Sequence, residues 1–428
     1  MKQVLIVSPD FIPHDYPSSL RIMNFVRHLM HFGWQPTVVT VKPECYEFSS
    51  DRGNGQLLPQ SVEIIRTSAF PSKLTRKVGI GDIGLRSLWY HWREVSRLCQ
   101  RRKPDLLFIS IPPYFSAILG RMIHDTYGVP YVIDYIDPWV TLNYWKRSDI
   151  KRTLKRNLSY KLSRILEPFV LRHVSHIVGV SKGTTDPVIS RYSWLEEKDA
   201  TEIPYGGEGA DFDYVLQNRR VNRIFNPNDG LIHVSSVGRA GEEFPSLEAI
   251  FQAFKLALKR SPKIFSRVRF HFVGTTYAPE GNGHYQVLST AERIGLKNFV
   301  DEYPQRVPYL DALKILLDSR ALLALGSGQP HYTASKIFHY ILARKPLLAV
   351  FHEASSVVRI LEETRAGQTV TFNSQHPPIE KVEEISRRLE EILYFLQTPP
   401  SQPVGKYSSV IPHEPWRSGL QTCSTESV

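Results

Sequence analysis

The sequence has little cysteine and no long apolar run. Its three cysteines, Cys45, Cys99 and Cys423, lie far apart in 428 residues and form no C-x-x-C pair. The sequence therefore indicates neither a disulfide framework nor a zinc site. No window of about 18 uncharged apolar residues occurs, which argues against a membrane-spanning helix. The apolar run before Ser8 is too short for the core of a signal peptide, so we expect a cytoplasmic protein.

Two common catalytic motifs are also missing. The chain contains no G-x-x-x-x-G-K-[ST] phosphate loop and no G-x-S-x-G nucleophile turn. Gly79, Gly81 and Gly84 do spell G-x-G-x-x-G, but this run follows the basic segment Ser72–Val78 and not a strand. Because the dinucleotide fingerprint requires a preceding strand, we interpret these glycines as a flexible loop on the substrate side.

The length and composition support two folded domains. With 428 residues and 42% apolar content, the chain can fill two cores of about 200 residues each. The net charge of +11 is concentrated in residues 1–200, which contain 28 Lys and Arg against 18 Asp and Glu, whereas the remainder contains 25 against 24. A basic first half suits nucleic acid, an anionic membrane surface or an anionic substrate.

Strand and helix patterns alternate along the chain. The expected strands are near-continuous apolar runs, which are typical of parallel strands covered on both faces. They fall at Val4–Ser8, Pro36–Val41, Val62–Thr67, Asp105–Ser110, Val129–Asp134, His176–Ser181, Leu231–Val237, Arg269–Gly274, Ala321–Leu325, Leu347–Phe351 and Thr369–Phe372. Helical patterns fall between most of them, notably at Ser18–Phe32, Leu85–Lys103, Ser246–Lys259, Tyr309–Asp318, Ser335–Ala343, Ser355–Glu363 and Ile379–Leu396. This order predicts an α/β protein with two doubly wound, Rossmann-like domains that face an interdomain cleft.

Changes in composition mark the expected boundaries. The stretch from Tyr205 to Gly230 is polar and rich in turn residues, and helical periodicity is lost after Gln397. Such stretches connect domains or lie at their ends. We therefore predict a first domain at 1–205, a linker at 206–230, a second domain at 231–396 and a C-terminal tail at 397–428.

Residues 331–351 are the most informative segment. Ser335 and Lys336 lie in the first turn of a short expected helix, where free backbone N–H groups and the helix dipole attract an anion. Leu347–Phe351 follows as a buried strand. A loop that enters a helix beside a parallel sheet predicts a phosphate-binding place. Helix capping is the alternative role for Ser335.

Four places carry the motifs of a known family in that family's order. They are Val4–Val41 with its G-W-x-x-T-V-x-T ending, Pro104–Gly120 together with GVPYVIDYIDPW, Val234–Phe254 with its G-R turn, and Ser335–Phe351 with its S-K and K-P-x-L-A elements. In this combination the chain resembles the GT-B-fold glycosyltransferases of the retaining group 1 type, which are similar to family 4. The resemblance supports the expected pair of α/β domains.

The resemblance implies that the second domain binds a nucleotide diphosphate sugar and that the first domain binds the acceptor. The diphosphate would meet Arg239, which follows Gly238 in the G-R turn, with Ser335 and Lys336 as further contacts. A guanidinium at a strand end can bind a phosphate through two hydrogen bonds, and Gly274 would let the backbone approach the ligand closely. A surface turn is the alternative for Arg239. No cofactor is implied, because the nucleotide sugar is a co-substrate.

Two histidines stand where the family usually has carboxylates, one near the sugar and one at the ribose diol. His331 and His339 occupy these positions. A neutral imidazole offers one acceptor and one donor, so we expect altered donor binding. On one helix the two would lie about 12 Å apart, too far for one metal ion. Phe244 and Ile136 replace a lysine and an arginine of the family pattern, whereas Asp137 is retained and is a candidate catalytic group on the acceptor side.

The loop before the first expected helix completes the predicted site. Ser19 and Arg21 would touch donor or acceptor there, and helix capping is the alternative for the serine. The predicted site comprises catalytic Arg239, Lys336 and Asp137, donor-binding Gly238, Gly274, His331, Ser335 and His339, acceptor-side Ser19 and Arg21, and no metal.

Residues 146–172 form a strongly basic stretch with Leu, Ile and Phe at helical spacing. One interpretation is an amphipathic helix that packs on its own core with a solvated charged face. The other is a dock for an anionic membrane surface. Few aromatic residues are interleaved with the basic ones, so we expect no nucleic-acid binding.

These features predict a cytoplasmic hexosyltransferase, peripheral on the inner face of the membrane. It would move a sugar to a glycan or lipid-linked acceptor in surface polysaccharide or cell-envelope biosynthesis. Because both histidines replace carboxylates, a GT-B-like binding or assembly subunit without transfer activity stays open. A nucleotide-sugar epimerase is a further alternative.

Overall fold

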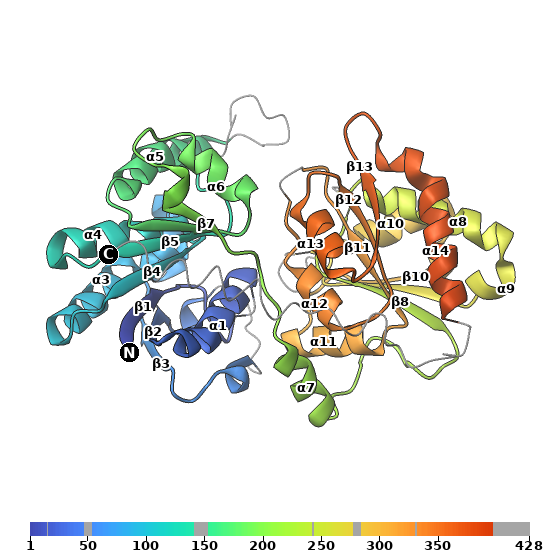
Figure 1. Ribbon diagram of the computed structural model, residues 1–428, viewed down its shortest axis with the longest axis horizontal. Helices are drawn as coiled ribbons and strands as arrows, with labels where there is room; N and C mark the ends of the chain where they lie inside the picture. The colour runs from blue at the N-terminus through green and yellow to red at the C-terminus, as the bar shows by residue number, and fades with distance from the viewer. Residues whose placement is uncertain are drawn as a thin grey trace. The chain divides into compact units, whose positions relative to one another are not determined.

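The computed structural model describes residues 1–14, 16–46, 54–140, 153–241, 244–276, 284–329 and 332–396. The chain forms two compact units (Figure 1). The first begins at Met1 and continues to Gly206, and the second begins at Gly207. The C-terminal tail predicted at 397–428 lies outside the described residues.

The first unit is built on a seven-stranded sheet in the order β3-β2-β1-β4-β5-β6-β7. All neighbouring strands are parallel. The strands are β1 Lys2–Val7, β2 Trp34–Val41, β3 Glu63–Thr67, β4 Leu106–Ile111, β5 Tyr131–Tyr135, β6 His176–Gly179 and β7 Ala200–Glu202. The α-helices of this unit are α1 Pro17–Leu29, α2 Ser72–Thr75, α3 Ile83–Arg101, α4 Ile118–Tyr127, α5 Leu154–Leu171 and α6 Lys182–Ile189.

The second unit has a six-stranded parallel sheet in the order β10-β9-β8-β11-β12-β13. Its strands are β8 Ile232–Val237, β9 Val268–Val273, β10 Val300–Tyr303, β11 Ala321–Leu325, β12 Leu347–His352 and β13 Gln368–Phe372. The α-helices are α7 Gly209–Gln217, α8 Ser246–Arg260, α9 Pro262–Phe265, α10 Gln286–Ile294, α11 Tyr309–Asp318, α12 Lys336–Leu342, α13 Ser356–Thr364 and α14 Val382–Phe395. Helices α8 and α14 pack against each other (Figure 1).

Both units are doubly wound α/β domains, which confirms the predicted fold class. The strand order reverses between β1 and β4 in the first sheet and between β8 and β11 in the second. In such sheets, ligands bind beyond the carboxyl ends of the strands at the point of reversal. The central strands supply the cores; Ile6, Ile109 and Leu325, for example, are fully buried. The residues just after β8 and β11 are therefore the first place to look for a ligand site.

The structure adds elements that the apolar pattern does not reveal. Strand β7 has only three residues, and β10 has the sequence VDEY, so neither forms an apolar run. Helix α7 lies inside the stretch for which a linker was predicted, and it belongs to the second unit. Within the described part of the chain, no helix is both long enough and apolar enough to cross a membrane.

Candidate functional site

Gly238 and Lys336 meet at the carboxyl end of β8. Gly238 has a φ of 118°, a backbone conformation that side-chain-bearing residues rarely adopt. A Cβ on this glycine would lie 3.2 Å from Cδ of Lys336. The absence of a side chain therefore lets the stem of Lys336 lie directly against the turn after β8. The G-R turn thus contributes Arg239 and, through Gly238, also provides the surface on which the side chain of Lys336 packs.

Helix α12 is fixed to the end of β8 by two side chains. The Nζ of Lys336 donates to the backbone oxygen of Arg239 at 3.3 Å. One turn later, the hydroxyl of Tyr340 accepts from the Val237 nitrogen at 2.6 Å and donates to the Val237 oxygen at 3.0 Å. Burial lowers the pKa of Lys336 to about 8. Lys336 is thus a half-buried, positively charged group held beside the Arg239 turn.

Ser335 and Gly274 flank this group. Ser335 precedes α12, and its side chain makes no capping hydrogen bond. Gly274 directly follows β9 and has a φ of 72°, and its nitrogen donates to the oxygen of Tyr303 at 2.8 Å. Because carboxyl ends of neighbouring parallel strands share one edge, Gly238 and Gly274 lie at the same edge of the sheet. His331 lies outside the described residues.

His339 belongs to a partly buried chain of hydrogen bonds that the sequence does not reveal. The hydroxyl of Tyr309 donates to Oδ2 of Asp211 at 2.9 Å and lies 3.1 Å from Nε2 of His339. Burial lowers the pKa of His339 to about 4, so its ring is neutral at pH 7. A carboxylate only accepts, so the single Tyr309 proton points to Asp211 and the hydroxyl oxygen accepts from His339. The imidazole therefore carries its proton on Nε2 and offers Nδ1 as an acceptor.

In the Tyr309→Phe variant, the ring of His339 should no longer be restricted to the Nε2–H tautomer. Without the hydroxyl, His339 and Asp211 each lose a buried partner, and we expect a loss of about 1–3 kcal/mol in the free energy of unfolding. Nitrogen-15 NMR of the histidine side chains should show His339 as the Nε2–H form in the parent and as a mixture in the variant. The exposed Tyr285→Phe is the matched control. Finding the Nδ1–H form in the parent would contradict this chain of hydrogen bonds.

Arg21 has a structural role in place of the predicted ligand contact. Its Nε lies 2.9 Å and its Nη2 2.8 Å from oxygens of Asp134 on β5, and its Nη1 donates to the oxygen of Pro204 at 2.9 Å. Both charged side chains are buried, with side-chain exposures of 2% and 0%. A guanidinium whose nitrogens are committed in this way ties α1 to β5, so its role as an acceptor contact is corrected here.

Ser19 and Asp137 have opposite environments. Ser19 on α1 is fully buried, and among the described residues its Oγ has no hydrogen-bond partner, so its contact with donor or acceptor stays a prediction. Asp137 follows β5 and is exposed. Its charge helps raise the pKa of Tyr114, after the larger effect of burial. Asp137 therefore lies near Tyr114 at the carboxyl edge of the first sheet, and its role on the acceptor side stays a prediction.

A second acidic group at this edge was missed in the sequence. Asp82 caps α3 by accepting from the nitrogen of Leu85 at 2.8 Å. Burial raises the pKa of Asp82 to about 6. Nearby, Nδ1 of His14 lies 3.4 Å from Oδ1 of Asp10 after β1. Within the ranges that the structure describes, no three His, Cys, Asp or Glu side chains are arranged to hold a metal ion.

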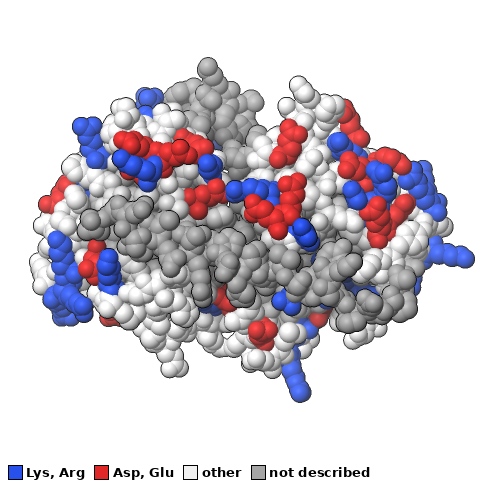
Figure 2. All heavy atoms as spheres, viewed as in Figure 1, with Lys and Arg blue, Asp and Glu red and all other residues white. Residues whose placement is uncertain are grey.

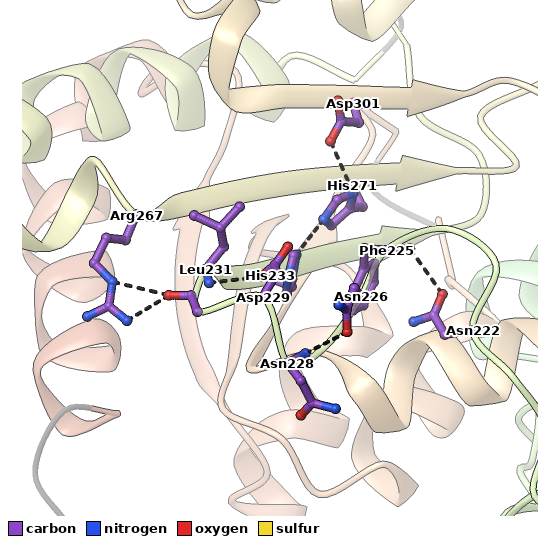
Figure 3. Close-up of polar contacts among 11 residues, drawn as sticks. Asn222, Phe225, Asn226, Asn228, Asp229, Leu231, His233, Arg267, His271 and Asp301 are labelled. Carbon is purple, nitrogen blue, oxygen red and sulfur yellow. Dashed lines mark hydrogen bonds and ion pairs between the residues drawn. The ribbon is translucent and has the colours of Figure 1, made fainter.

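A pair of buried histidines lies on the sheet of the second unit (Figure 3). Nδ1 of His233 on β8 is 2.8 Å from Nε2 of His271 on β9. Outside this pair, Nε2 of His233 is 2.9 Å from Asp229, and Nδ1 of His271 is 3.4 Å from Asp301. The ring of Phe225 stacks on both histidines, at centroid distances of 4.3 and 4.5 Å. The cluster thus fastens the segment before β8 to the sheet.

This pair predicts a loss of stability in acid. Burial, with the charges of His233 and Arg269, lowers the pKa of His271 to about 3. Below about pH 6.5 the His271 side chain takes up a proton in the unfolded chain but not in the folded chain. The free energy of unfolding therefore falls as the pH is lowered below about 6.5, by up to about 1.4 kcal/mol per pH unit. Urea unfolding should show a smaller pH slope for His271→Gln than for the parent or the exposed control His284→Gln. Parallel slopes in all three proteins would refute the assignment.

Comparisons with known proteins agree with this architecture. Residues 18–206 match the family described as glycosyl transferase 4-like domain. No curated protein matches the sequence. Among solved structures, a glycosyltransferase from Rickettsia africae is similar with 12% identity and a TM-score of 0.56, over 93% of this chain and 89% of that one.

Two further solved structures have the same fold. HepE of Anabaena, in complex with UDP and glucose, is 13% identical with a TM-score of 0.55, over 92% of each chain. WaaG, a glycosyltransferase involved in lipopolysaccharide biosynthesis, is 13% identical with a TM-score of 0.54, over 91% of this chain and 90% of that one. Residues 18–206 of the first unit thus match the glycosyl transferase 4-like domain, and the whole chain, with its two doubly wound sheets, has the GT-B fold of these solved structures.

Proposed function

We propose that the protein transfers a hexosyl group from a nucleotide diphosphate sugar to a glycan or lipid-linked acceptor, in surface polysaccharide or cell-envelope biosynthesis. The observation that carries the proposal is Lys336, seated on Gly238 with its Nζ 3.3 Å from the Arg239 oxygen. This arrangement holds the positive charge of Lys336 beside the backbone of Arg239, at the strand reversal of the second sheet. HepE in complex with UDP and glucose, and WaaG in lipopolysaccharide biosynthesis, support this class of donor and acceptor by analogy.

The chemistry needs stabilisation of a leaving group. When the bond between the anomeric carbon and the diphosphate oxygen breaks, negative charge develops on that oxygen. The ammonium of Lys336 and the guanidinium of Arg239 would receive this charge through short, charge-assisted hydrogen bonds. Removing one such donor typically slows a reaction by about 10²- to 10³-fold.

We further propose that the reaction retains the anomeric configuration and needs no metal ion. In this scheme the acceptor oxygen forms its bond on the face from which the diphosphate departs. The acceptor proton goes to the departing phosphate oxygen, so that no side-chain nucleophile is needed. Two cationic side chains would supply the charge that a divalent metal supplies elsewhere. Asp137, exposed after β5, is the group that would orient the acceptor hydroxyl.

A panel of nucleotide sugars tests the proposal. The full chain is incubated with uridine, guanosine and thymidine diphosphate sugars, with a glycan or lipid extract as acceptor, and release of the nucleoside diphosphate is measured. We expect release from one donor class that rises when acceptor is added. Release that is as fast without acceptor and leaves an isomerised sugar would favour the epimerase. Silence with every donor, in a protein shown to be folded, would contradict transfer.

Two observations keep a non-transferring GT-B subunit as the second candidate. Phe244, at the position of a family lysine, is only 3% exposed and belongs to the apolar core. His339, at the position of a family carboxylate, is neutral because burial lowers its pKa to about 4, and its Nε2 lies 3.1 Å from the hydroxyl of Tyr309. A thermal-shift screen separates the two candidates. Stabilisation by a nucleoside diphosphate supports the transferase, and no stabilisation by any of them supports the subunit.

We also propose a cytoplasmic location, peripheral on the inner face of a membrane. The basic charge of the first half of the chain favours an anionic surface. A lipid-linked acceptor would be presented at that surface. The basic segment 146–172 is the part of the chain to which this proposal assigns the contact, and its residues 146–152 lie outside the described ranges.

A further inference from the structure

Helix α5 turns its apolar stripe outward. Five large apolar side chains on it are exposed, and successive members are three or four residues apart, so they form one stripe along the helix. They are Leu154 at 91%, Leu158 at 68%, Leu162 at 38%, Ile165 at 67% and Phe169 at 46% exposure. The sequence left open whether such a stripe would pack on the core. In the structure it does not, so the core-packing interpretation of these residues is corrected.

The opposite face of α5 is held to the unit by polar contacts. Glu167 is fully buried and accepts from the hydroxyl of Tyr192 at 2.7 Å and from the guanidinium of Arg191. Nε1 of Trp139 donates to Oγ of Ser163 at 3.1 Å. Rotating the helix to bury its apolar stripe would pull Glu167 and Ser163 away from these partners. The outward stripe is therefore the orientation that the core itself enforces.

The exposed charges along α5 have one sign. The single acidic residue of the helix, Glu167, is buried, whereas Lys161 and Arg164 are exposed. Lys161 lies three residues after Leu158 and four before Ile165, so it borders the stripe. Elsewhere on the face drawn in Figure 2, positive and negative side chains are interspersed. An apolar stripe bordered by Lys and Arg is the pattern of helices that lie in a membrane interface.

We infer that α5 docks in the plane of an anionic lipid bilayer, with the stripe from Leu154 to Phe169 in the acyl boundary and Lys161 and Arg164 among the head groups. A second copy of the chain is disfavoured as the occupant, because it would bring two basic faces together. Nucleic acid would leave the apolar stripe unused. The inference specifies the membrane contact of the proposed function, but the binding of lipid requires no transfer activity.

Vesicle flotation with the full chain tests this docking. The probes are vesicles of phosphatidylcholine alone and vesicles with an equal part of phosphatidylglycerol. We expect the parent to bind the anionic vesicles about tenfold more tightly or better, and added salt to reduce this preference. Leu158→Gln/Ile165→Gln should lose most of the binding. Lys161→Gln/Arg164→Gln should lose the preference for anionic lipid.

The matched control places the same substitution on exposed apolar residues elsewhere. Leu216 and Val221 of the second unit are 58% and 71% exposed, and Leu216→Gln/Val221→Gln should bind vesicles as the parent does. Equal binding by Leu158→Gln/Ile165→Gln and the parent would overturn the inference. So would self-association that this variant abolishes without any vesicle binding by the parent. If donors are never turned over but vesicles still bind through α5, only the transfer proposal fails.

Discussion

The Lys336→Met variant is expected to transfer sugar about 10²- to 10³-fold more slowly than the parent, the loss typical of removing one donor from a developing anion. Methionine keeps an apolar stem of similar length over Gly238, so the seat of the side chain is preserved. It removes only the ammonium that lies 3.3 Å from the Arg239 oxygen. The measurement is kcat/KM for the active donor, with circular dichroism to show that the fold is unchanged.

The pH dependence follows from the same group. Because burial lowers the pKa of Lys336 to about 8, the free protein loses this positive charge as pH rises through that value. Donor binding by the parent should therefore weaken above about pH 8, and Lys336→Met should lack this step. The control Lys297→Met removes an exposed lysine and should keep both the rate and the step. Full activity of Lys336→Met would exclude the ammonium from the reaction.

The Asp134→Ala variant is expected to lower the free energy of unfolding of the first unit by about 3–5 kcal/mol. In the parent, the Arg21 guanidinium contacts the Asp134 carboxylate at 2.8 and 2.9 Å. The substitution removes this carboxylate and leaves the guanidinium buried without its charged partner. An uncompensated buried charge is far more harmful than the loss of the pair as a whole. Urea unfolding, followed by a probe within residues 1–206, measures the effect.

The double variant Arg21→Met/Asp134→Leu separates charge from packing. Removing both charges should recover most of the stability that Asp134→Ala loses, because no ion stays buried alone. The surface pair of Arg121 and Asp125, with Asp125 47% exposed, is the control. Its Asp125→Ala variant should lose less than about 1 kcal/mol. If Asp134→Ala loses no more than this control, the buried pair does not stabilise the unit.

The sequence predicted the strands and helices correctly where their buried residues form a continuous apolar run or a strong helical period. Ala321–Leu325 and Tyr309–Asp318 agree with the predicted ranges, because burial on both faces or a strong helical period fixes them. Strand β10 was missed because its residues VDEY alternate between buried and half-buried positions. Helix α7 was missed because its surroundings are polar turns. The local sequence pattern thus predicts strands and helices that have a continuous apolar run or a strong helical period. It does not predict elements such as β10 and α7, which form only through their tertiary contacts.

The site was accessible only in part. The meeting of Gly238, Arg239 and Lys336 follows from two motifs at neighbouring strand ends. The partners of His339 do not, since Asp211 and Tyr309 come from helices far apart in the chain and no spacing links them. Periodicity also found the stripe of α5 but could not tell its direction, which is set by Glu167 and its distant partners. A contact pattern of this kind becomes visible only in three dimensions.

Calorimetric titration with the nucleoside diphosphate of the active donor tests the central claim most directly. The claim is that Arg239 and Lys336 hold the diphosphate at the end of β8. We predict that Arg239→Ala and Lys336→Met each weaken its binding by about tenfold or more, since charge-assisted hydrogen bonds of this kind contribute about 1.5–3 kcal/mol. Binding as tight in both variants as in the parent would contradict the claim.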